Sequence, residues 1–533
     1  MIKRVIMLCI LPCASVNATV HYASPGDNLQ AKLAALAEGD TLYFNEGTYN
    51  WNNAMRFGPG YTVVPASAAG TITLKAAPDA VSRPHIRCTT SGENIVDMND
   101  TRYYQFEDLE FSGGSAGFKM YNSSYVTIRN CYVHDTGGPA INLKLNTHHI
   151  TVEGCEIARP GGTGECFYVG SSSDEANHQV HHCLIDGNLI HGTLGTSQGD
   201  GVELKYMTYA NVVRNNVIYD VGYPGIFVYG HSTRTSEAEL NIIEGNVIFD
   251  TSTHGMQIYG QAVARNNIIF NTGGRGIEVR RDNRPVGQVR LVNNTLWNCN
   301  GNASDASVVL ANLSDASGVV IENNCVYAGT AYALALNPFN TPPHVSTRFY
   351  ANLWRSNGHG KPVFINKSGT SEYSAAEFRQ WLTDNGYAAA DPNSSDADPL
   401  FVNAAAWNFY PGESSPLRDM GTANYSPSTD FDGVLRDANP DCGAYEWTSS
   451  GGPLWNIGTT FKGTAVGPED PPPGGGKGGC GGASGAPGGA DSGAFFWIFT
   501  ASLLYLVRLI FRASGKSGQR RTSAHGCASG SDT

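Results

Sequence analysis

The chain has 533 residues, a formal net charge of −12 and only 15% charged side chains. An acidic chain without a dense stripe of lysine and arginine is not expected to bind nucleic acid. The charge does not exclude an anionic sugar chain, because a few basic residues can outweigh the global sign locally. The high glycine content, 63 residues, is typical of short strands joined by tight turns.

Residues 1–18 have the features of a secretory signal peptide. Two basic residues precede an apolar run over 5–11, and Val16-Asn17-Ala18 offers a small-residue cleavage site. Cys13 raises the alternative of a lipoprotein, but Pro12 replaces the small residue expected before a lipidated cysteine. We therefore expect a secreted protein.

The segment that follows predicts a helical cap. Residues 27–37 (DNLQAKLAALA) predict a short amphipathic helix, and residues 41–44 and 46–49 continue as strands. An open stack of coils would expose a sheet edge, so a helix over its first coil is expected. This segment resembles the N-terminal cap of right-handed parallel β-helix proteins.

From about Thr71 to about Tyr350 the chain repeats one pattern. An apolar-alternating strand ends in Asn-Asn, Gly-Asn or Asn-Cys, and a second short strand, a polar turn and a Gly-led third strand follow. Copies occupy residues 126–144, 212–230, 242–260 and 263–281. A repeat of roughly 20–30 residues without a helical period indicates a solenoid. We predict an all-β, right-handed parallel β-helix over 19–447, present as a monomer.

The turn asparagines are interpreted as scaffold rather than as ligands. Asparagine tolerates left-handed backbone angles, and its amide can bond to the same residue of the next coil. Cys131 and Cys155 share one phase and would stack about 4.8 Å apart. A buried ladder of small residues is favoured there, and a disulfide is the alternative. The recurring asparagines are Asn130, Asn188, Asn216, Asn246, Asn267, Asn294 and Asn324.

Beyond the repeats, a helical insertion is expected over 371–385. Residues 396–421 and 428–447 resemble the closing coil of many bacterial β-helix proteins, which ends on a similar Gly-Ala-Tyr-Glu. This resemblance implies architecture and carries no chemistry by itself.

The C-terminal composition predicts a tail of three parts. A Gly/Pro-rich linker (448–493) precedes an apolar transmembrane segment (494–511) and a basic cytoplasmic end (512–533). This order resembles the tripartite sorting tails of Gram-negative bacteria, which a membrane protease cuts. The resemblance implies a protein secreted or sorted to the cell surface and held in the membrane through its tail until processing. A permanent anchor is the alternative.

Aligning the Gly-led third strands predicts which side chains point outward. One outward row holds Asn142, Glu203, Phe227, Gln257 and Glu278. The row beside it holds Lys144, Lys205, Tyr229, Tyr259 and Arg280. Such an exposed strip of acids, cations and rings suits an acidic polysaccharide, because rings stack on sugars and cations meet uronate carboxylates. A merely solvated face is the alternative.

The sharpest local motif is Gly199-Asp200-Gly201-Val202-Glu203-Leu204-Lys205. It resembles the catalytic rung of family-nine pectate lyases, which are calcium-dependent β-helix enzymes with a lysine base. More loosely, it resembles the lysine rung of the chondroitinase B and alginate lyase group. The chain departs from each family in one respect. The pectate-lyase acidic cluster is only loosely matched by Asp174-Glu175. Where the chondroitinase B group carries an arginine on the next rung, this chain has Tyr229 and His231.

The resemblance implies β-elimination at a uronate, with Lys205 as the base. A lysine acts as a base when burial or nearby positive charge lowers its pKa. Asp200, Glu203 and Glu165 are the expected ligands of Ca²⁺, which prefers oxygen. His231 is expected to donate a proton to the leaving oxygen, and Lys144, Tyr229, Tyr259 and Arg280 to position the substrate. An exposed lysine paired with an acid is the alternative for Lys205.

The sequence also bears on three other functions. A non-catalytic surface protein that binds glycans or serves adhesion is the alternative class. Glycoside hydrolysis needs paired carboxylates, and Glu203 and Glu278 lie about three rungs, roughly 14 Å, apart. Zinc binding at the paired histidines is disfavoured, since His181 and His182 should point to opposite faces of a strand.

Overall fold

A computed structural model describes residues 18–462 apart from short gaps at 173–177, 196–197, 231–233, 235, 283, 285, 315, 317, 337–342, 367–369, 388–390, 392 and 450. The predicted transmembrane segment, and the signal peptide up to residue 17, lie outside these residues, as does His231. No helix within the described part of the chain is long and apolar enough to cross a membrane.

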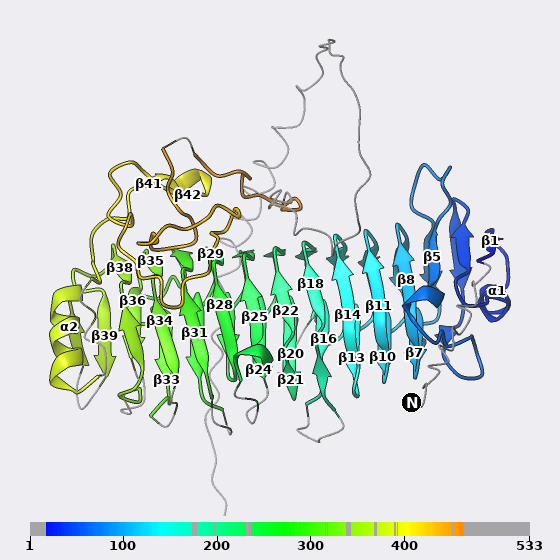
Figure 1. The fold of residues 1–533 in the computed structure, drawn as a ribbon, viewed down its shortest axis with the longest axis horizontal. Coiled ribbons are helices and arrows are strands. Elements are labelled where there is room, and N and C mark those ends of the chain that lie inside the picture. The colour runs from blue at the N-terminus through cyan, green and yellow to red at the C-terminus, as the bar shows by residue number, and fades with distance from the viewer. Residues whose placement is uncertain are drawn as a thin grey trace, which may run out of the picture. The chain divides into compact units, whose positions relative to one another are not determined.

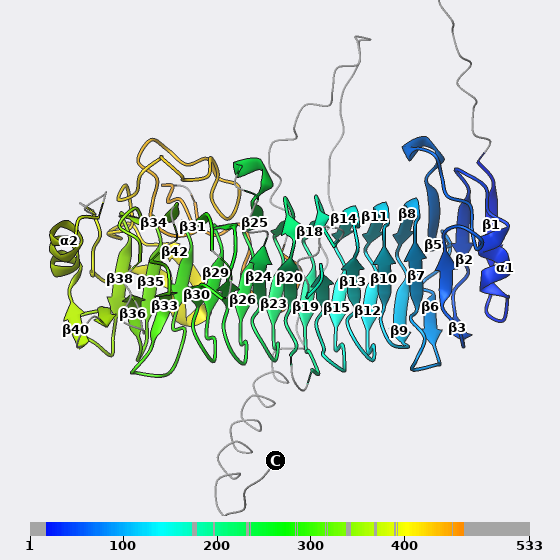
Figure 2. The same ribbon diagram turned by 90° about the horizontal axis from the view of Figure 1, so that it is seen from below.

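Three long sheets wrap the same coils, and their strands pair in parallel from one coil to the next (Figures 1 and 2). The predicted right-handed parallel β-helix is thereby confirmed. Each full coil runs through sheet A, then sheet B, then sheet C.

Sheet A contains β1 (Val20–Ala23), β2 (Thr41–Phe44), β5 (Ile72–Ala76), β8 (Arg102–Glu107), β11 (Ser124–Arg129), β14 (His148–Glu153), β18 (Leu184–Asp186), β22 (Val212–Arg214), β25 (Asn241–Glu244), β28 (Ala262–Arg265), β31 (Val289–Val292), β34 (Val319–Glu322) and β37 (Arg348–Tyr350), with the short β17 (Val180–His181) and β21 (Thr208–Tyr209). Sheet B contains β3 (Thr48–Trp51), β6 (His85–Cys88), β9 (Glu110–Gly113), β12 (Tyr132–His134), β15 (Glu156–Ala158), β19 (Leu189–His191), β23 (Val217–Tyr219), β26 (Val247–Phe249), β29 (Ile268–Phe270), β32 (Thr295–Trp297), β35 (Cys325–Ala328) and β38 (Leu353–Ser356). Sheet C contains β4 (Met55–Phe57), β7 (Val96–Asn99), β10 (Phe118–Tyr121), β13 (Ile141–Lys144), β16 (Phe167–Val169), β20 (Val202–Tyr206), β24 (Ile226–Gly230), β27 (Met256–Ile258), β30 (Ile277–Arg280), β33 (Ala306–Ala311), β36 (Tyr332–Leu336), β39 (Val363–Asn366) and the antiparallel β40 (Thr370–Tyr373).

Helices cover both ends of the stack, where a sheet edge would otherwise be open. α1 (Leu29–Ala34) begins after Asn28, whose side chain accepts from the amide of Ala31. α2 (Ala375–Asp384) begins with a capping box between Ser374 and Glu377. Both helices were predicted, with longer bounds. After Ala34 the chain continues in i→i+3 bonds from Ala35 and Leu36 instead of the α-helical pattern, and the first part of the expected 371–385 segment forms β40.

The interior is filled by the inward residues of the three sheets. The apolar pairs predicted from the repeat are buried in one continuous core, among them Ile141 with Leu143 and Val202 with Leu204. The predicted asparagine ladder is present at the turn between sheets A and B. The two properties that we expected of one asparagine belong to two consecutive residues. One residue takes the left-handed conformation, and the next carries the ladder amide.

Asn130 is therefore not a ladder residue: it is exposed, has a φ of 51° and precedes Cys131, which holds the ladder position. Cys131 and Cys155 are buried free thiols, and the amide of Cys131 donates to Cys155 Sγ at 3.4 Å. The predicted thiol ladder is confirmed. From Cys155 onward the ladder continues through Asn188, Asn216, Asn246, Asn267, Asn294, Asn324 and Asn352.

The segment predicted to close the stack does so only briefly. Ser395 pairs in parallel with Leu353 of β38, after which the chain folds back beside the stack (Figure 1). It carries η3 (Ala404–Ala406) and the hairpin β41 (Phe401–Asn403) and β42 (Asn408–Pro411). Its aromatic residues pack on the outer face of sheet B, against Phe249 and Phe270. Packing continues past the predicted boundary at 447, since Lys462 donates to the carbonyl of Phe431 at 2.9 Å. Two further 3-10 turns are η1 (Ala68–Gly70) and η2 (Glu237–Glu239).

Candidate active site

Three carboxylates converge on the outer side of sheet C, at the coils that carry β16 and β20. Glu165 precedes β16, and Asp200 and Glu203 belong to the next coil, as the bond from the amide of Cys166 to the carbonyl of Asp200 shows. One oxygen from each side chain lies within 4.8 Å of the others. The structure therefore brings together the three residues predicted to bind a cation.

All three carboxylates are deeply buried, with at most 1% of each residue exposed. Thr163 donates to one oxygen of Glu165 at 2.7 Å. Glu165 Oε1, Asp200 Oδ1 and Glu203 Oε2 accept no hydrogen bond from the described residues. Burying an ionised carboxylate oxygen without a partner costs free energy. Binding a proton or a cation would remove this cost.

Lys205 lies against this carboxylate cluster. Its Nζ is 2.5 Å from Glu203 Oε1, and its side chain is only 8% exposed. The same ammonium lies 5.1 Å from the ring centroids of Tyr168 and Tyr229, within cation–π range. The surroundings of Lys205 thus combine negative charge, aromatic faces and little water.

Burial shifts the pKa values of Asp200 and Glu203. It raises the pKa of Asp200 well above its usual range, and the charges of Glu203 and Glu165 act in the same direction. Burial also raises the pKa of Glu203 to about 7, although Lys205 opposes this shift. Burial therefore favours the protonated forms of Asp200 and Glu203, and a bound cation would oppose this shift.

The predicted substrate-binding residues lie on neighbouring rungs. Lys144 Nζ is 4.6 Å from the Tyr168 ring, and burial lowers its pKa with help from Lys119 and Lys205. Tyr229 and Tyr259 have ring centroids 5.6 Å apart. Arg280 lies over the Tyr259 ring at 4.8 Å. Lys144 and Lys205 both lie over the Tyr168 ring, and Lys205 also faces the Tyr229 ring. Tyr229 in turn contacts Tyr259, so the predicted residues form one continuous group along the stack.

Two expectations about this face were wrong. The strip is not an exposed row: Glu203 and Glu278 are 1% exposed, Lys205 6% and Tyr259 8%. Large side chains cover one another, as the 4.2 Å separation of the Phe227 and Tyr229 rings shows. The row also contains a rung that the repeat alignment missed. β16 lies between β13 and β20 and places Tyr168 between Asn142 and Glu203.

The strand that carries Tyr168 could have been found from its alternation. Phe167-Tyr168-Val169 has the same in–out–in pattern as Ile141-Asn142-Leu143, but Cys166 stands directly before it, where a glycine precedes β20, β24, β27 and β30. The three-rung separation of Glu203 and Glu278 is confirmed by the register of β20, β24, β27 and β30.

The structure also shows a cluster of polar side chains around Glu278 that was not predicted from the sequence. Glu278 pairs with Arg275 and lies 3.9 Å from Nε2 of His254. Arg275 Nε also contacts Asp305 at 3.1 Å. Arg275 and Asp305 line a cavity of about 240 Å³ together with Phe364. The outer face of sheet C thus offers polar groups well beyond the Lys205 rung.

The paired histidines of sheet A also differ from expectation. His181 and His182 do not point to opposite faces, because His182 has a φ of 54° and breaks the strand alternation. Their Nδ1 atoms lie 2.7 Å apart, as do those of His148 and His149. The His148 and His181 rings stack at 5.0 Å. These residues form an aromatic stack that spans two coils.

Comparison with known proteins agrees with the architecture. A family model described as a right handed beta helix region matches residues 81–198. No curated protein matches the chain. Solved structures similar to this chain include pectate lyase Pel9A, at 15% identity over 81% of this chain and 96% of that one, with a TM-score of 0.45. An alginate lyase from Paenibacillus sp. str. FPU-7 matches at 16% identity over 61% and 97%, with a TM-score of 0.40. The AlgE4 A-module, a mannuronan C-5 epimerase of Azotobacter vinelandii, matches at 14% identity over 61% and 91%, with a TM-score of 0.38.

Proposed function

We propose that this protein is a secreted, calcium-assisted polysaccharide lyase that cleaves an acidic polysaccharide by β-elimination at a uronate. The observation that carries the proposal is the group of three buried carboxylates, each with an unpartnered oxygen, beside Lys205. A solvated surface has no reason to bury three acids together.

The donor set fits Ca²⁺ in its chemistry. The ion prefers carboxylate and carbonyl oxygens and adapts to irregular geometry. Glu165, Asp200 and Glu203 would hold it. When bound, calcium supplies positive charge that neutralises the cluster and the carboxylate of a uronate substrate.

Lys205 is placed to act as the base. In its neutral form Nζ removes the proton from the carbon next to the uronate carboxylate. A carbon–carbon double bond then forms as the bond to the leaving glycosidic oxygen breaks. Positive charge on the carboxylate cluster would compete with Lys205 for Glu203 and favour the neutral amine. Lys144, still half-buried, would meet an anionic sugar, and the rings of Tyr229 and Tyr259 would pack on sugar faces.

The test is a screen for the unsaturated product. The purified protein is incubated with pectate, alginate and glycosaminoglycans in the presence of calcium, and ultraviolet absorbance of the product is followed. Activity on one polymer, lost in Lys205→Ala and kept in Lys75→Ala, is expected. Lys75 serves as the matched control because it lies on sheet A and pairs with Glu107.

Saturable binding of a polymer without product would contradict the lyase and identify a glycan-binding protein instead. Activity that survives in Lys205→Ala would remove Lys205 from the chemistry.

A further inference from the structure

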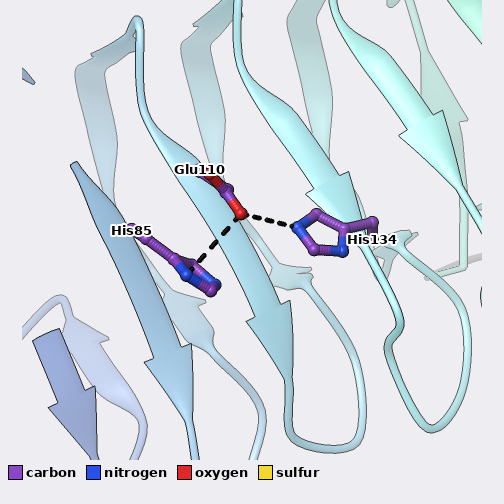
Figure 3. A group of neighbouring side chains, drawn as sticks. All are labelled: His85, Glu110 and His134. Atoms are coloured by element: carbon purple, nitrogen blue, oxygen red, sulfur yellow. Dashed lines mark hydrogen bonds and ion pairs between the residues drawn. The ribbon is translucent and has the colours of Figure 1, made fainter. Parts of the chain in front are cut away.

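His85, Glu110 and His134 converge on the outer face of sheet B, on a different sheet from Lys205 (Figure 3). They come from β6, β9 and β12, three successive rungs of the stack. His85 lies directly opposite Glu110, whereas His134 is opposite Ser112 and reaches Glu110 diagonally. Parallel stacking therefore brings residues up to 49 positions apart, from 85 to 134, to one point.

The three ligand atoms have the spacing of a metal site. Glu110 Oε1 is 3.0 Å from His134 Nε2 and 3.6 Å from His85 Nδ1, and all three atoms lie within 4.8 Å of one another. Zinc bonds of about 2.0–2.2 Å at tetrahedral angles require ligand atoms about 3.3–3.6 Å apart. Small side-chain movements suffice to reach that geometry.

The other nitrogen of each ring is already held. His85 Nε2 lies 2.7 Å from Ser112 Oγ, and His134 Nδ1 lies 2.7 Å from Asp135 Oδ2. Asp135 is in turn bonded by Arg159 at 2.8 Å. Histidines that bind metal characteristically use one nitrogen for the ion and donate the other N–H to an oxygen, which fixes the orientation of the ring. Both rings therefore carry the outer partners expected of metal ligands.

We propose that His85, Glu110 and His134 form a binding site for a divalent transition-metal ion of the zinc class. Two imidazole nitrogens and one carboxylate oxygen suit zinc, whereas calcium requires more oxygen ligands. The side chains are 11–27% exposed, so solvent reaches the point where they converge and water completes the coordination. The ion would link three coils of the stack. This proposal is independent of the proposed lyase activity.

The experiment titrates the full-length protein with Zn²⁺ against a chromophoric chelator, with calcium present to occupy the carboxylate cluster. One equivalent of zinc is expected, together with a rise of the thermal midpoint on binding. His85→Ala, His134→Ala and Glu110→Gln are expected to lose this equivalent. Ser112→Ala keeps all three ligands and is expected to weaken binding by about 10–100-fold.

Two variants serve as controls. His191 also pairs with a glutamate on sheet B, at 3.1 Å from Glu156, but belongs to no such cluster among the described residues, so His191→Ala should retain the zinc. His148→Ala tests the histidine stack of sheet A in the same way. The proposal is overturned if His85→Ala and His134→Ala bind zinc like the native protein, or if the zinc is lost in His148→Ala instead. Should either alanine variant fail to fold, Ser112→Ala decides, and unchanged zinc affinity in it would contradict the site.

Discussion

Glu203 shares one carboxylate oxygen with Lys205 at 2.5 Å, while its other oxygen has no hydrogen-bond partner among the described residues. Only one of the two oxygens of Glu203 therefore has a partner, and an unpaired charge in a buried position is destabilising. A second cation bound to the free oxygens of the cluster would balance their charge. That cation and Lys205 would then share the carboxylate of Glu203.

Replacing Lys205 by alanine should lower kcat by about 10²–10⁴-fold, the usual contribution of a general base. Lys205→Arg should not restore activity, because a guanidinium does not lose its proton in proteins. The measurement is initial rate of the unsaturated product on the polymer found in the screen. Lys144→Ala is the matched comparison, and we expect it to raise KM more than it lowers kcat. An equal loss of kcat in both variants would argue against a base at Lys205.

Asp200→Asn should have opposite effects with and without calcium. Without the ion, the substitution removes a buried carboxylate whose Oδ1 has no partner, so the variant should unfold at a higher temperature than the native protein. With calcium at about 100 times its Kd, the native protein should gain about 2.7 kcal/mol and the variant much less. Thermal unfolding with calcium or with a chelator measures both. Asp79→Asn, at an exposed position, should respond to calcium like the native protein.

The histidine stack should make the fold sensitive to acid. Burial lowers the pKa of His181 to about 4, and His148 and His182 add to the shift. In the unfolded chain this residue takes up a proton near pH 6.5, so its stabilising effect is complete above that pH and disappears as the pH falls towards 4. The full effect would be about 3 kcal/mol, and partial exposure reduces it to about 1–2 kcal/mol.

His181→Phe keeps a ring in the stack but cannot titrate, so its free energy of unfolding should depend less on pH between about 6.5 and 4. Denaturant unfolding at several pH values measures the slope. His344→Gln, at a partly buried histidine outside this stack, is the control. A native slope in His181→Phe would show that the other histidines carry the effect.

Removing one amide from the asparagine ladder should be strongly destabilising. Asn267 donates to the Ile243 carbonyl and to Asn294, and accepts from the amide of Asn246, all buried. Asn267→Ala leaves several of these groups unpaired at about 1–3 kcal/mol each, so a loss of at least about 3 kcal/mol is expected. Asn50→Ala, on an exposed strand position, should cost under about 0.5 kcal/mol. Denaturant unfolding of both variants provides the comparison.

The sequence predicted the fold well because its signals are periodic. Inward residues such as Ile226 and Val228 recur in one phase along the coils, and the register follows from that phase. The convergence of Glu165 with Asp200 and Glu203 also followed from stacking, since successive coils must bring equivalent positions together.

What the sequence could not supply was burial on the outer face. Alternation correctly predicts that Glu203 and Lys205 point away from the core. It does not predict that the rings of Tyr168 and Tyr229 lie on either side of the Lys205 ammonium. The convergence of His85 with His134 was missed for another reason. Glu110 lies directly opposite His85, but His134 lies opposite Ser112 and contacts Glu110 diagonally. A diagonal contact does not follow from the repeat pattern of the sequence.

The asparagine ladder has a consequence for how this protein can change. Successive ladder residues are separated by 33, 28, 30 and 21 residues between Cys155 and Asn267, yet each makes the same bond to the next. The corner between sheets A and B is thereby kept in register in the coils from Cys131 to Asn352, and differences in length fall in the rest of each coil. The longest of these intervals, from Cys155 to Asn188, is the one that holds Glu165 and Tyr168. Insertions and deletions can therefore remodel the surroundings of the carboxylates while the neighbouring coils stay in register.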